Sequence, residues 1–255
     1  DATNGTDYTP TLTGSVDIPA GQAFVDITIT PTDDSIDEAD ETVTLTLIDG
    51  AAYDLGASTS DTGTITDDDV VGILITPTSG LITTEAGGTA TFTVVLSSQP
   101  TSDVVINLSS SNTGEGTVAP TPLTFTSGDW DQAQTVTVTG VDDLIIDGDI
   151  AYEINAFVSS ADLLYNSVVP DTVNVTNQDD DVAGITVTPI SGLVTTEAGG
   201  TATFTVVLNS QPSADVTIAL SSNNTNEGTI SPNNVIFNDL DWDQPQTITI
   251  TGVDD

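Results

Sequence analysis

An internal repeat restricts the fold of this chain more than any other feature of its sequence. The segment TTEAGGTATFTVVL at 83–96 recurs letter for letter at 195–208, and TGVDD at 139–143 recurs at 251–255. The acidic triplet 67–69 returns at 179–181 with the same spacing of 112 residues. This period indicates one structural unit, so we expect a partial unit at 1–70, a complete unit at 71–182 and a partial unit at 183–255.

The complete unit shows the two-residue alternation that is typical of β-strands. In 89–96, Phe92 and Val94 alternate with threonines, and in 134–141, Val136 and Val138 do the same. Further strands are expected at 73–77, 103–110, 121–126, 151–160 and 171–178, and no segment has a helical period. These short strands, rich in Val, Ile and Thr, predict an all-β fold of tandem immunoglobulin-like antiparallel β-sandwiches.

The two partial units hold complementary parts of the repeat. The first contains the later strands of a unit and the last contains the earlier ones, so the simplest interpretation is a window on a longer tandem array. The alternative is self-association, in which a neighbouring molecule supplies the missing strands by β-strand addition. Both interpretations lead to a fibre.

Charge compensation within this chain cannot come from its side chains. There are 39 Asp and Glu residues and no Lys, Arg, His or Cys, which gives a net charge of −39. Such acidity would repel nucleic acid and anionic membranes, and no apolar run is long enough for membrane insertion. We also expect no enzyme activity, because the usual general base and nucleophiles are missing. The remaining ligand atoms are oxygens, which suit Ca²⁺ and other hard cations.

In a sandwich, strand ends bring acidic residues from distant segments to one pole. If the strands at 134–141 and 171–177 run in the same direction, Glu85 and the acidic residues after both strands meet there. The residues expected to bind metal at this pole are Glu85, Asp142, Asp143, Asp147, Asp149, Asp179, Asp180 and Asp181. Without cations such a cluster repels itself by about 4 kcal/mol for each pair 4 Å apart, so we predict several calcium ions at each junction between units.

The first unit resembles the Calx-beta family, a calcium-binding sandwich of exchangers, integrins and large bacterial surface proteins. The resemblance is carried by NGTDYT from Asn4, by GQAFVDITITPTDDSIDEADETVTLTL at 21–47 and by the closing DDD. In that family the Asp of GTDY, the DD pair, two following Glu and the terminal acidic run bind calcium. The resemblance thus implies a calcium site made of Asp7, Asp33, Asp34, Glu38, Glu41, Asp67, Asp68 and Asp69.

The other two units depart from the family pattern. Asp142, Asp143 and Asp147 match the DD pair and the first Glu, while Ile150 stands at the second Glu and Asp149 is its substitute. The resemblance implies further ligands at the early acidic position and where NTGEGT replaces GTDY. These ligands and their repeats are Glu85, Glu115, Glu197 and Glu227, with Asp254 and Asp255 repeating Asp142 and Asp143.

These features predict a calcium-rigidified structural repeat of an extracellular bacterial filament or adhesin stalk. The alternative is a calcium-dependent adhesion module that binds glycans or another cell. A calcium sensor is a third reading, against which the repetition argues. Scattered residues such as Asp61 and Asp171 are expected only to keep the protein soluble.

Overall fold

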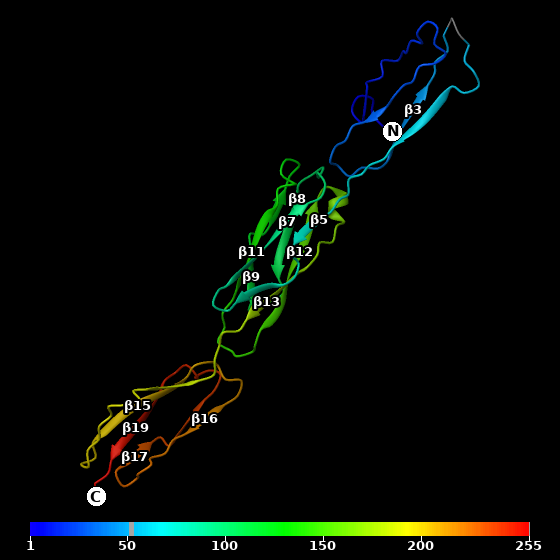
Figure 1. Cartoon of the computed structure of the whole chain (residues 1–255). Coiled ribbons are helices and arrows are strands. Elements are labelled where there is room, and N and C mark those ends of the chain that lie inside the picture. The colour runs from blue at the N-terminus through cyan, green and yellow to red at the C-terminus, as the bar shows by residue number, and fades with distance from the viewer. Residues whose placement is uncertain (51–53, 255) are drawn as a thin grey trace.

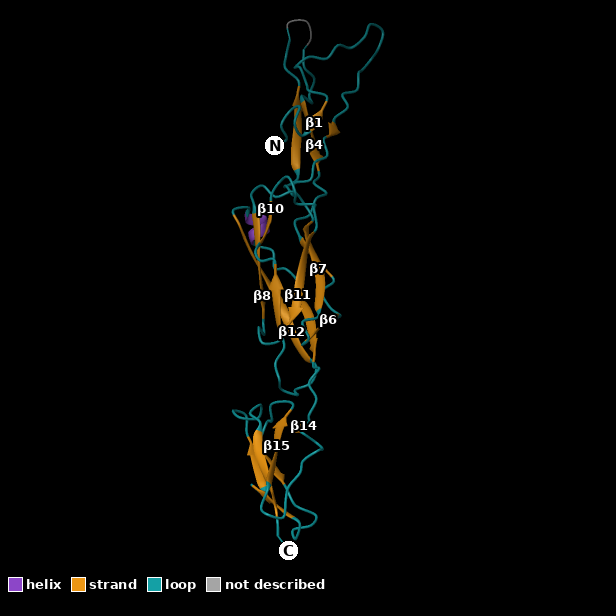
Figure 2. Cartoon of the chain, turned by 90° about the vertical axis from the view of Figure 1, so that its left-hand side faces the viewer, coloured by secondary structure: helices purple, strands orange, loops and turns teal. Residues whose placement is uncertain are grey.

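The computed structural model describes residues 1–50 and 54–254. In this part of the chain strands dominate, and one short turn is the only helix. Figure 1 shows three groups of strands that follow one another along one axis, and the rotated view in Figure 2 shows the same narrow shape. The described residues include no helix with the length and apolar character needed to cross a membrane.

The middle group is a β-sandwich, which confirms the predicted fold class. Its sheets have the strand orders β10-β8-β12-β13-β6 and β5-β7-β11-β9. The first sheet consists of β6 (Leu81–Thr84), β8 (Val104–Ser110), β10 (Leu123–Phe125), β12 (Ile150–Ser160) and β13 (Val173–Gln178). The second consists of β5 (Ile73–Thr76), β7 (Thr89–Leu96), β9 (Gly116–Ala119) and β11 (Gln134–Gly140).

The core of the sandwich is built from the alternating apolar residues of both sheets. Phe92 and Val94 of β7, and Val136 of β11, are at most 1% exposed. They pack in one cluster with residues of the facing sheet, including Ile106 and Val175. Because side chains of a strand point to opposite faces in turn, the intervening threonines stay at the surface. Trp130 is half-buried and packs against this cluster.

Three local features of the middle unit differ from the sequence prediction. Strands β6 and β9, of four residues each, were not expected. The pair β6–β13 is parallel, whereas we expected antiparallel strands throughout. The single turn of helix α1 (Leu163–Asn166) has no period to detect, and Asp162 caps it by accepting from Leu164 N at 3.0 Å.

The outer groups contain fewer strands. The first group has two antiparallel pairs, formed by β1 (Tyr8–Thr9) with β2 (Thr30–Pro31) and by β3 (Glu41–Thr46) with β4 (Ser60–Ile65). The last group has a sheet of β14 (Ile185–Thr188), β15 (Thr201–Leu208), β19 (Gln246–Gly252) and β17 (Gly228–Ser231). Its remaining pair is β16 (Val216–Ala219) with β18 (Asn234–Phe237).

Identical sequence has different surroundings in the middle and last units. Phe92 is buried in the middle sandwich, but its counterpart Phe204 is only half-buried. Residues 81–84 form strand β6 beside β13, whereas the corresponding residues 193–196 form no strand. Residues 81–84 form a strand because they pair with β13, and the described residues provide no such partner for 193–196. The unit boundaries at 70/71 and 182/183 stay a prediction.

Candidate metal centre

The parallel pair β6–β13 brings the first acidic residues of the middle unit together. Thr84 is in register with Gln178, so Glu85 and Asp179 follow neighbouring strand ends. The backbone N–H of Glu85 donates to Gln178 O at 3.1 Å, and that of Asp180 donates to Glu85 Oε2 at 3.3 Å. The end of strand β6 and the end of strand β13, the last strand of the unit, thus share one pole.

Strand β11 adds a second set of acidic residues to the same pole. Its last residue, Gly140, donates its N–H to Gly88 O at 2.9 Å, and Val141 N–H donates to Glu115 O at 2.9 Å. A Cβ atom at Gly140 would lie 2.2 Å from Thr84 O, so only glycine allows this close approach. Asp142 and Asp143 follow directly.

Three groups of carboxylates at this pole have the spacing of metal ligands. Within each group one oxygen of every residue lies within 4.8 Å of the others. The groups are Glu85, Asp179 and Asp181; Glu85, Asp142 and Asp180; and Glu115, Asp143 and Asp147. Glu85 belongs to two groups, so its carboxylate can bridge two neighbouring cations. Of the residues expected at this pole, only the exposed Asp149 is in none of the groups.

The donor set of these groups fits a hard divalent cation. Glu85 and Glu115 are 2% and 6% exposed, and every candidate ligand atom is a carboxylate oxygen. Asp181 Oδ2 is buried without any hydrogen-bond partner, a costly condition for a charged atom. Asp179, by contrast, accepts from Asp181 N–H at 2.8 Å and from Gly148 N–H at 2.9 Å. The group around Asp181 therefore lacks a positive partner among the protein atoms.

Burial and mutual repulsion alter the acidities of these residues. Burial, opposed by the N–H of Asp180 and assisted by the charges of Asp179 and Asp143, raises the pKa of Glu85 to about 7. Burial and the neighbouring charges, led by that of Asp179, also raise the pKa of Asp181. The backbone donors of Asp181 and Gly148 lower the pKa of Asp179. The pole thus holds groups that resist ionisation beside one that favours it.

A buried polar network supports Glu115 from behind, and sequence reasoning missed it. Asn177, which is 1% exposed, donates from Nδ2 to Glu115 Oε2 at 3.2 Å and to Val141 O at 3.0 Å. Its Oδ1 accepts from Thr83 Oγ1 at 2.9 Å, and Thr83 Oγ1 also contacts Tyr152 OH at 3.2 Å. The only signal in the sequence was polar residues at inward positions of two strands.

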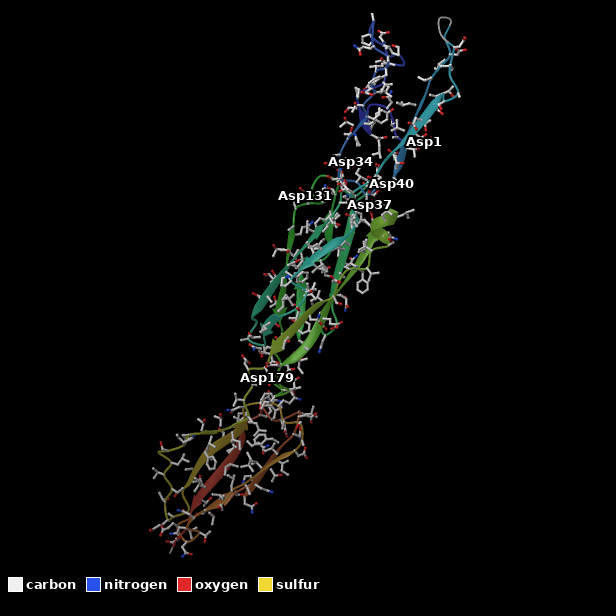
Figure 3. The ribbon with its side chains drawn as sticks, turned by 45° about the vertical axis from the view of Figure 1, so that its right-hand side comes forward. Asp1, Asp34, Asp37, Asp40, Asp131 and Asp179 are labelled. Atoms are coloured by element: carbon white, nitrogen blue, oxygen red, sulfur yellow. The ribbon has the colours of Figure 1, made fainter. Side chains whose placement is uncertain are left out.

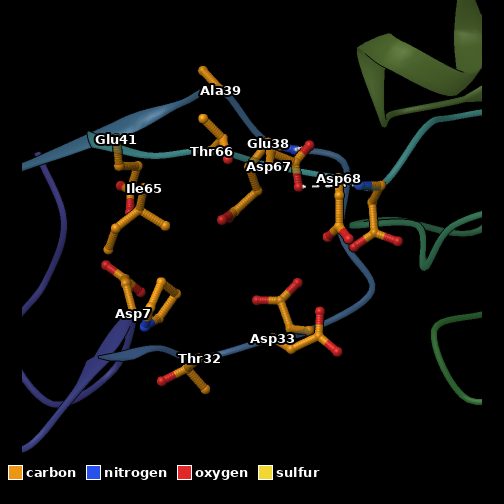
Figure 4. A pocket seen from close by; sticks show the side chains of 13 residues that line it. Asp7, Thr32, Asp33, Glu38, Ala39, Glu41, Ile65, Thr66, Asp67 and Asp68 are labelled. Atoms are coloured by element: carbon orange, nitrogen blue, oxygen red, sulfur yellow. Dashed lines mark hydrogen bonds between the residues drawn. The ribbon is translucent and has the colours of Figure 1, made fainter. Parts of the chain in front are cut away.

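In the first unit, the acidic residues surround a cavity of about 140 Å³. Figure 4 shows carboxylates facing one another across this space. All eight residues implied by the family resemblance line it: Asp7, Asp33, Asp34, Glu38, Glu41, Asp67, Asp68 and Asp69. None of them belongs to the three close groups, so this site is more open than that of the middle unit.

Hydrogen bonds join the two acidic segments of this first site. Asp67 Oδ2 accepts from Glu38 N–H at 3.0 Å, and Asp40 Oδ1 accepts from Asp67 N–H at 3.2 Å. Burial, followed by the charge of Asp34, raises the pKa of Glu38. Burial, followed by the charges of Asp67 and Asp68, raises the pKa of Asp69. Asp40 was not among the expected residues, although it lies inside the same acidic run.

The candidate ligands of the last unit do not come together. Glu197, Glu227 and Asp254 are exposed, and no acidic group with metal-ligand spacing includes them among the described residues. Asp255 lies outside the described residues. In the middle unit, Asp179–Asp181 complete the pole. Metal binding by these residues stays a prediction.

No protein-family model and no curated protein matches this chain. Among solved structures, the chain is similar to the apo form of the Calx CBD1 domain, at 18% identity and a TM-score of 0.34, over 44% of this chain and 98% of that one. It is also similar to the calcium binding domain CBD12 of CALX1.1, at 18% identity and a TM-score of 0.32, over 72% and 76%. The YadV chaperone matches at 12% identity and a TM-score of 0.34, over 71% and 86%. Membership of the Calx-beta family stays a prediction from the sequence.

Proposed function

We propose that this chain is a calcium-rigidified structural segment of an extracellular filament or adhesin stalk. The single observation that carries the proposal is the buried, partnerless Asp181 Oδ2 inside a group of three carboxylates at the pole between two units. A divalent cation held by Glu85, Asp179 and Asp181 would supply the missing partner. When bound, calcium would neutralise these charges and link the strand ends that carry them.

The energies favour cations over an empty acidic cluster at pH 7. Two carboxylates 4.8 Å apart repel by about 3 kcal/mol at an effective dielectric of 20. Three such pairs in one fully ionised group would approach the net stability of a typical domain, about 5–15 kcal/mol. Lys, Arg and His are missing from the whole sequence, so no side chain can relieve this repulsion. Oxygen ligands in loose geometry are what calcium prefers over transition metals.

The acidic loops also contact the next unit, which supports a role in rigidity. Leu144 O accepts from Gln211 N–H at 2.7 Å, one residue after Asp143. The first junction repeats this contact, since Ser35 O, one residue after Asp34, accepts from Gln99 N–H at 2.5 Å. Figure 3 shows Asp34, Asp37 and Asp40 near the first junction and Asp179 at the second.

Each acidic pair fixes the shape of its contacting loop. Asp143 Oδ1 accepts from Ile145 N–H at 2.7 Å, and Asp34 Oδ1 accepts from Ile36 N–H at 2.8 Å. Beyond the first loop, Asp37 Oδ2 accepts from Val71 N–H at 2.6 Å. A cation that holds the acidic pair would therefore also hold the loop against the following unit. Rigidity between units follows from binding at the pole.

The composition of the chain suits a structural protein outside the cell. The chain has no Lys or Arg, which removes every cleavage site for trypsin-like proteases and suits a protein outside the cell. Its acidic clusters repeat at successive junctions, and repetition favours an architectural role over a catalytic one. We therefore propose no enzyme activity for these carboxylates.

Calorimetry tests calcium binding directly. Calcium titrated into the chain after dialysis against EDTA should bind and raise the melting temperature, because cations stabilise only the folded pole. Asp181→Asn should weaken this binding, while Asp131→Asn, at an exposed site away from the groups, should not. Absence of binding heat together with an unchanged melting temperature would overturn the proposal.

A further inference from the structure

We propose that strands β6 and β13 form a mechanical clamp that resists stretching of the chain. The clamp consists of residues 81–84 and 175–178, which pair in parallel over four registered positions. The inference rests on the proposed function, since a filament or stalk carries tension along its length. It adds a specific load-bearing element to that function.

The path of the chain places this clamp under sliding load. The chain enters the middle unit at the pole next to the first unit and leaves it at the opposite pole (Figure 1). Strand β6 belongs to the entering segment, and β13 is the last strand before the exit. Tension first loads β5, which precedes β6 and pairs with β7, and then pulls the two parallel strands in opposite directions along their own axes. All bonds between them must then resist together, rather than opening one after another.

Hydrogen bonds extend the clamp beyond its four registered pairs. At one end Asn174 N–H donates to Thr78 O at 2.9 Å, and at the other end Glu85 N–H donates to Gln178 O at 3.1 Å. Within the clamp, Thr83 Oγ1 donates to Asn177 Oδ1 at 2.9 Å. Thr83 and Asn177 are 0% and 1% exposed, so water cannot readily replace this bond.

The described parts of the other units lack an equivalent clamp. Residues 193–196, the counterparts of β6, form no strand. In the first unit, β3 and β4 are antiparallel neighbours in sequence. The middle unit should therefore unfold last when the chain is stretched. Its unfolding event is recognisable by length, because residues 71–182 span about 370–400 Å when fully extended at 3.3–3.6 Å per residue, far more than when folded.

Single-molecule force spectroscopy in EDTA can compare two pulling directions. The sequence has no cysteine, so introduced cysteines give unique attachment points. Handles at the chain ends load the clamp by sliding. Handles at Ser79→Cys and Thr172→Cys, two exposed positions before β6 and β13, peel it from one end. We expect peeling to need roughly half the force or less, because the hydrogen-bonded residue pairs of the clamp then open one after another. Equal forces would overturn the proposal.

A pair of variants separates clamp strength from general stability. Thr83→Val removes the buried bond to Asn177, and Ser98→Ala removes a similarly buried contact to Tyr165 OH at 3.0 Å outside the clamp. Both should lower the melting temperature, but only Thr83→Val should lower the end-to-end unfolding force. Equal loss of force in both would contradict the clamp. Because EDTA is present throughout, failure here leaves calcium binding untouched, and absence of calcium binding leaves the clamp untouched.

Discussion

The metal-free middle unit should lose stability as pH rises, and Glu85 should account for a defined part of that loss. The pKa of Glu85 is about 7 in the folded chain, against an ordinary value of 4.5. The raised pKa means that the folded state holds the proton more tightly, so this contribution to stability is full below pH 4.5 and disappears as pH rises through 7. The whole shift corresponds to about 3 kcal/mol, most of which falls between pH 5 and pH 8.

Glu85→Gln removes this titration while keeping the shape of the side chain. The difference in unfolding free energy between pH 5 and pH 8 should therefore be about 2–3 kcal/mol smaller in Glu85→Gln than in the parent chain. Working at pH 5 keeps the protein above its isoelectric point of about 4.1. Calcium should reverse the trend in the parent chain, because its binding requires the ionised carboxylate.

Tryptophan fluorescence during urea unfolding in EDTA measures this difference. Trp130 belongs to the middle unit and Trp242 to the last, so Trp242→Phe in every sample leaves Trp130 as the only reporter. Glu197→Gln is a matched control, since Glu197 has the same neighbours in sequence but is exposed. The reasoning fails if Glu85→Gln and Glu197→Gln show the same dependence on pH.

Three further substitutions test the site and the core. Asp142→Asn combined with Asp143→Asn should weaken calcium binding, measured by calorimetry, roughly tenfold or more, which corresponds to about 1.4 kcal/mol. The control pair Asp61→Asn and Asp171→Asn should change the affinity little. Gly140→Ala should destabilise the middle unit by about 1–3 kcal/mol, because the added Cβ would lie 2.2 Å from Thr84 O. Gly128→Ala is the control and should change stability less, since the nearest atom to its Cβ would be 3.8 Å away. Ile106→Ala should lower the free energy of unfolding in urea by about 2–5 kcal/mol. Ile218→Ala should lower it less, because Ile106 is fully buried and its counterpart Ile218 is only half-buried. Equal losses would contradict this difference in packing.

The strands were predictable where alternation is long. The eight residues of β7 and the seven of β11 have inward apolar positions that the structure buries, including Phe92 and Val138. Strand β6 escaped prediction because its inward positions include the polar Thr83 and its outward ones the apolar Ile82, so LITT lacks the usual alternation. Its conformation also depends on β13, a neighbour almost a hundred residues away in sequence, as the strandless counterpart at 193–196 shows.

The acidic pole was predictable from strand direction, but its supporting contacts were not. Glu85 and Asp179 were expected to meet because strand ends share a pole, and they do. Sequence could not show that Glu115 is held by Asn177, since that bond depends on side-chain positions across the core. Nor could it show that Asp149 stays outside the groups while Asp147 joins one, since both are exposed. These outcomes depend on side-chain positions that only the assembled sheets and loops determine.

The distance between two units, measured with and without calcium, tests the central claim most directly. Spin labels at Ser109→Cys and Thr217→Cys would occupy exposed strand positions in the middle and last units of a chain without native cysteine. Pulsed electron resonance should give one narrow distance distribution in calcium and a clearly broader one in EDTA. Equal widths in the two conditions, with calcium binding verified in the same sample, would contradict the idea that cations at the pole make the junction rigid.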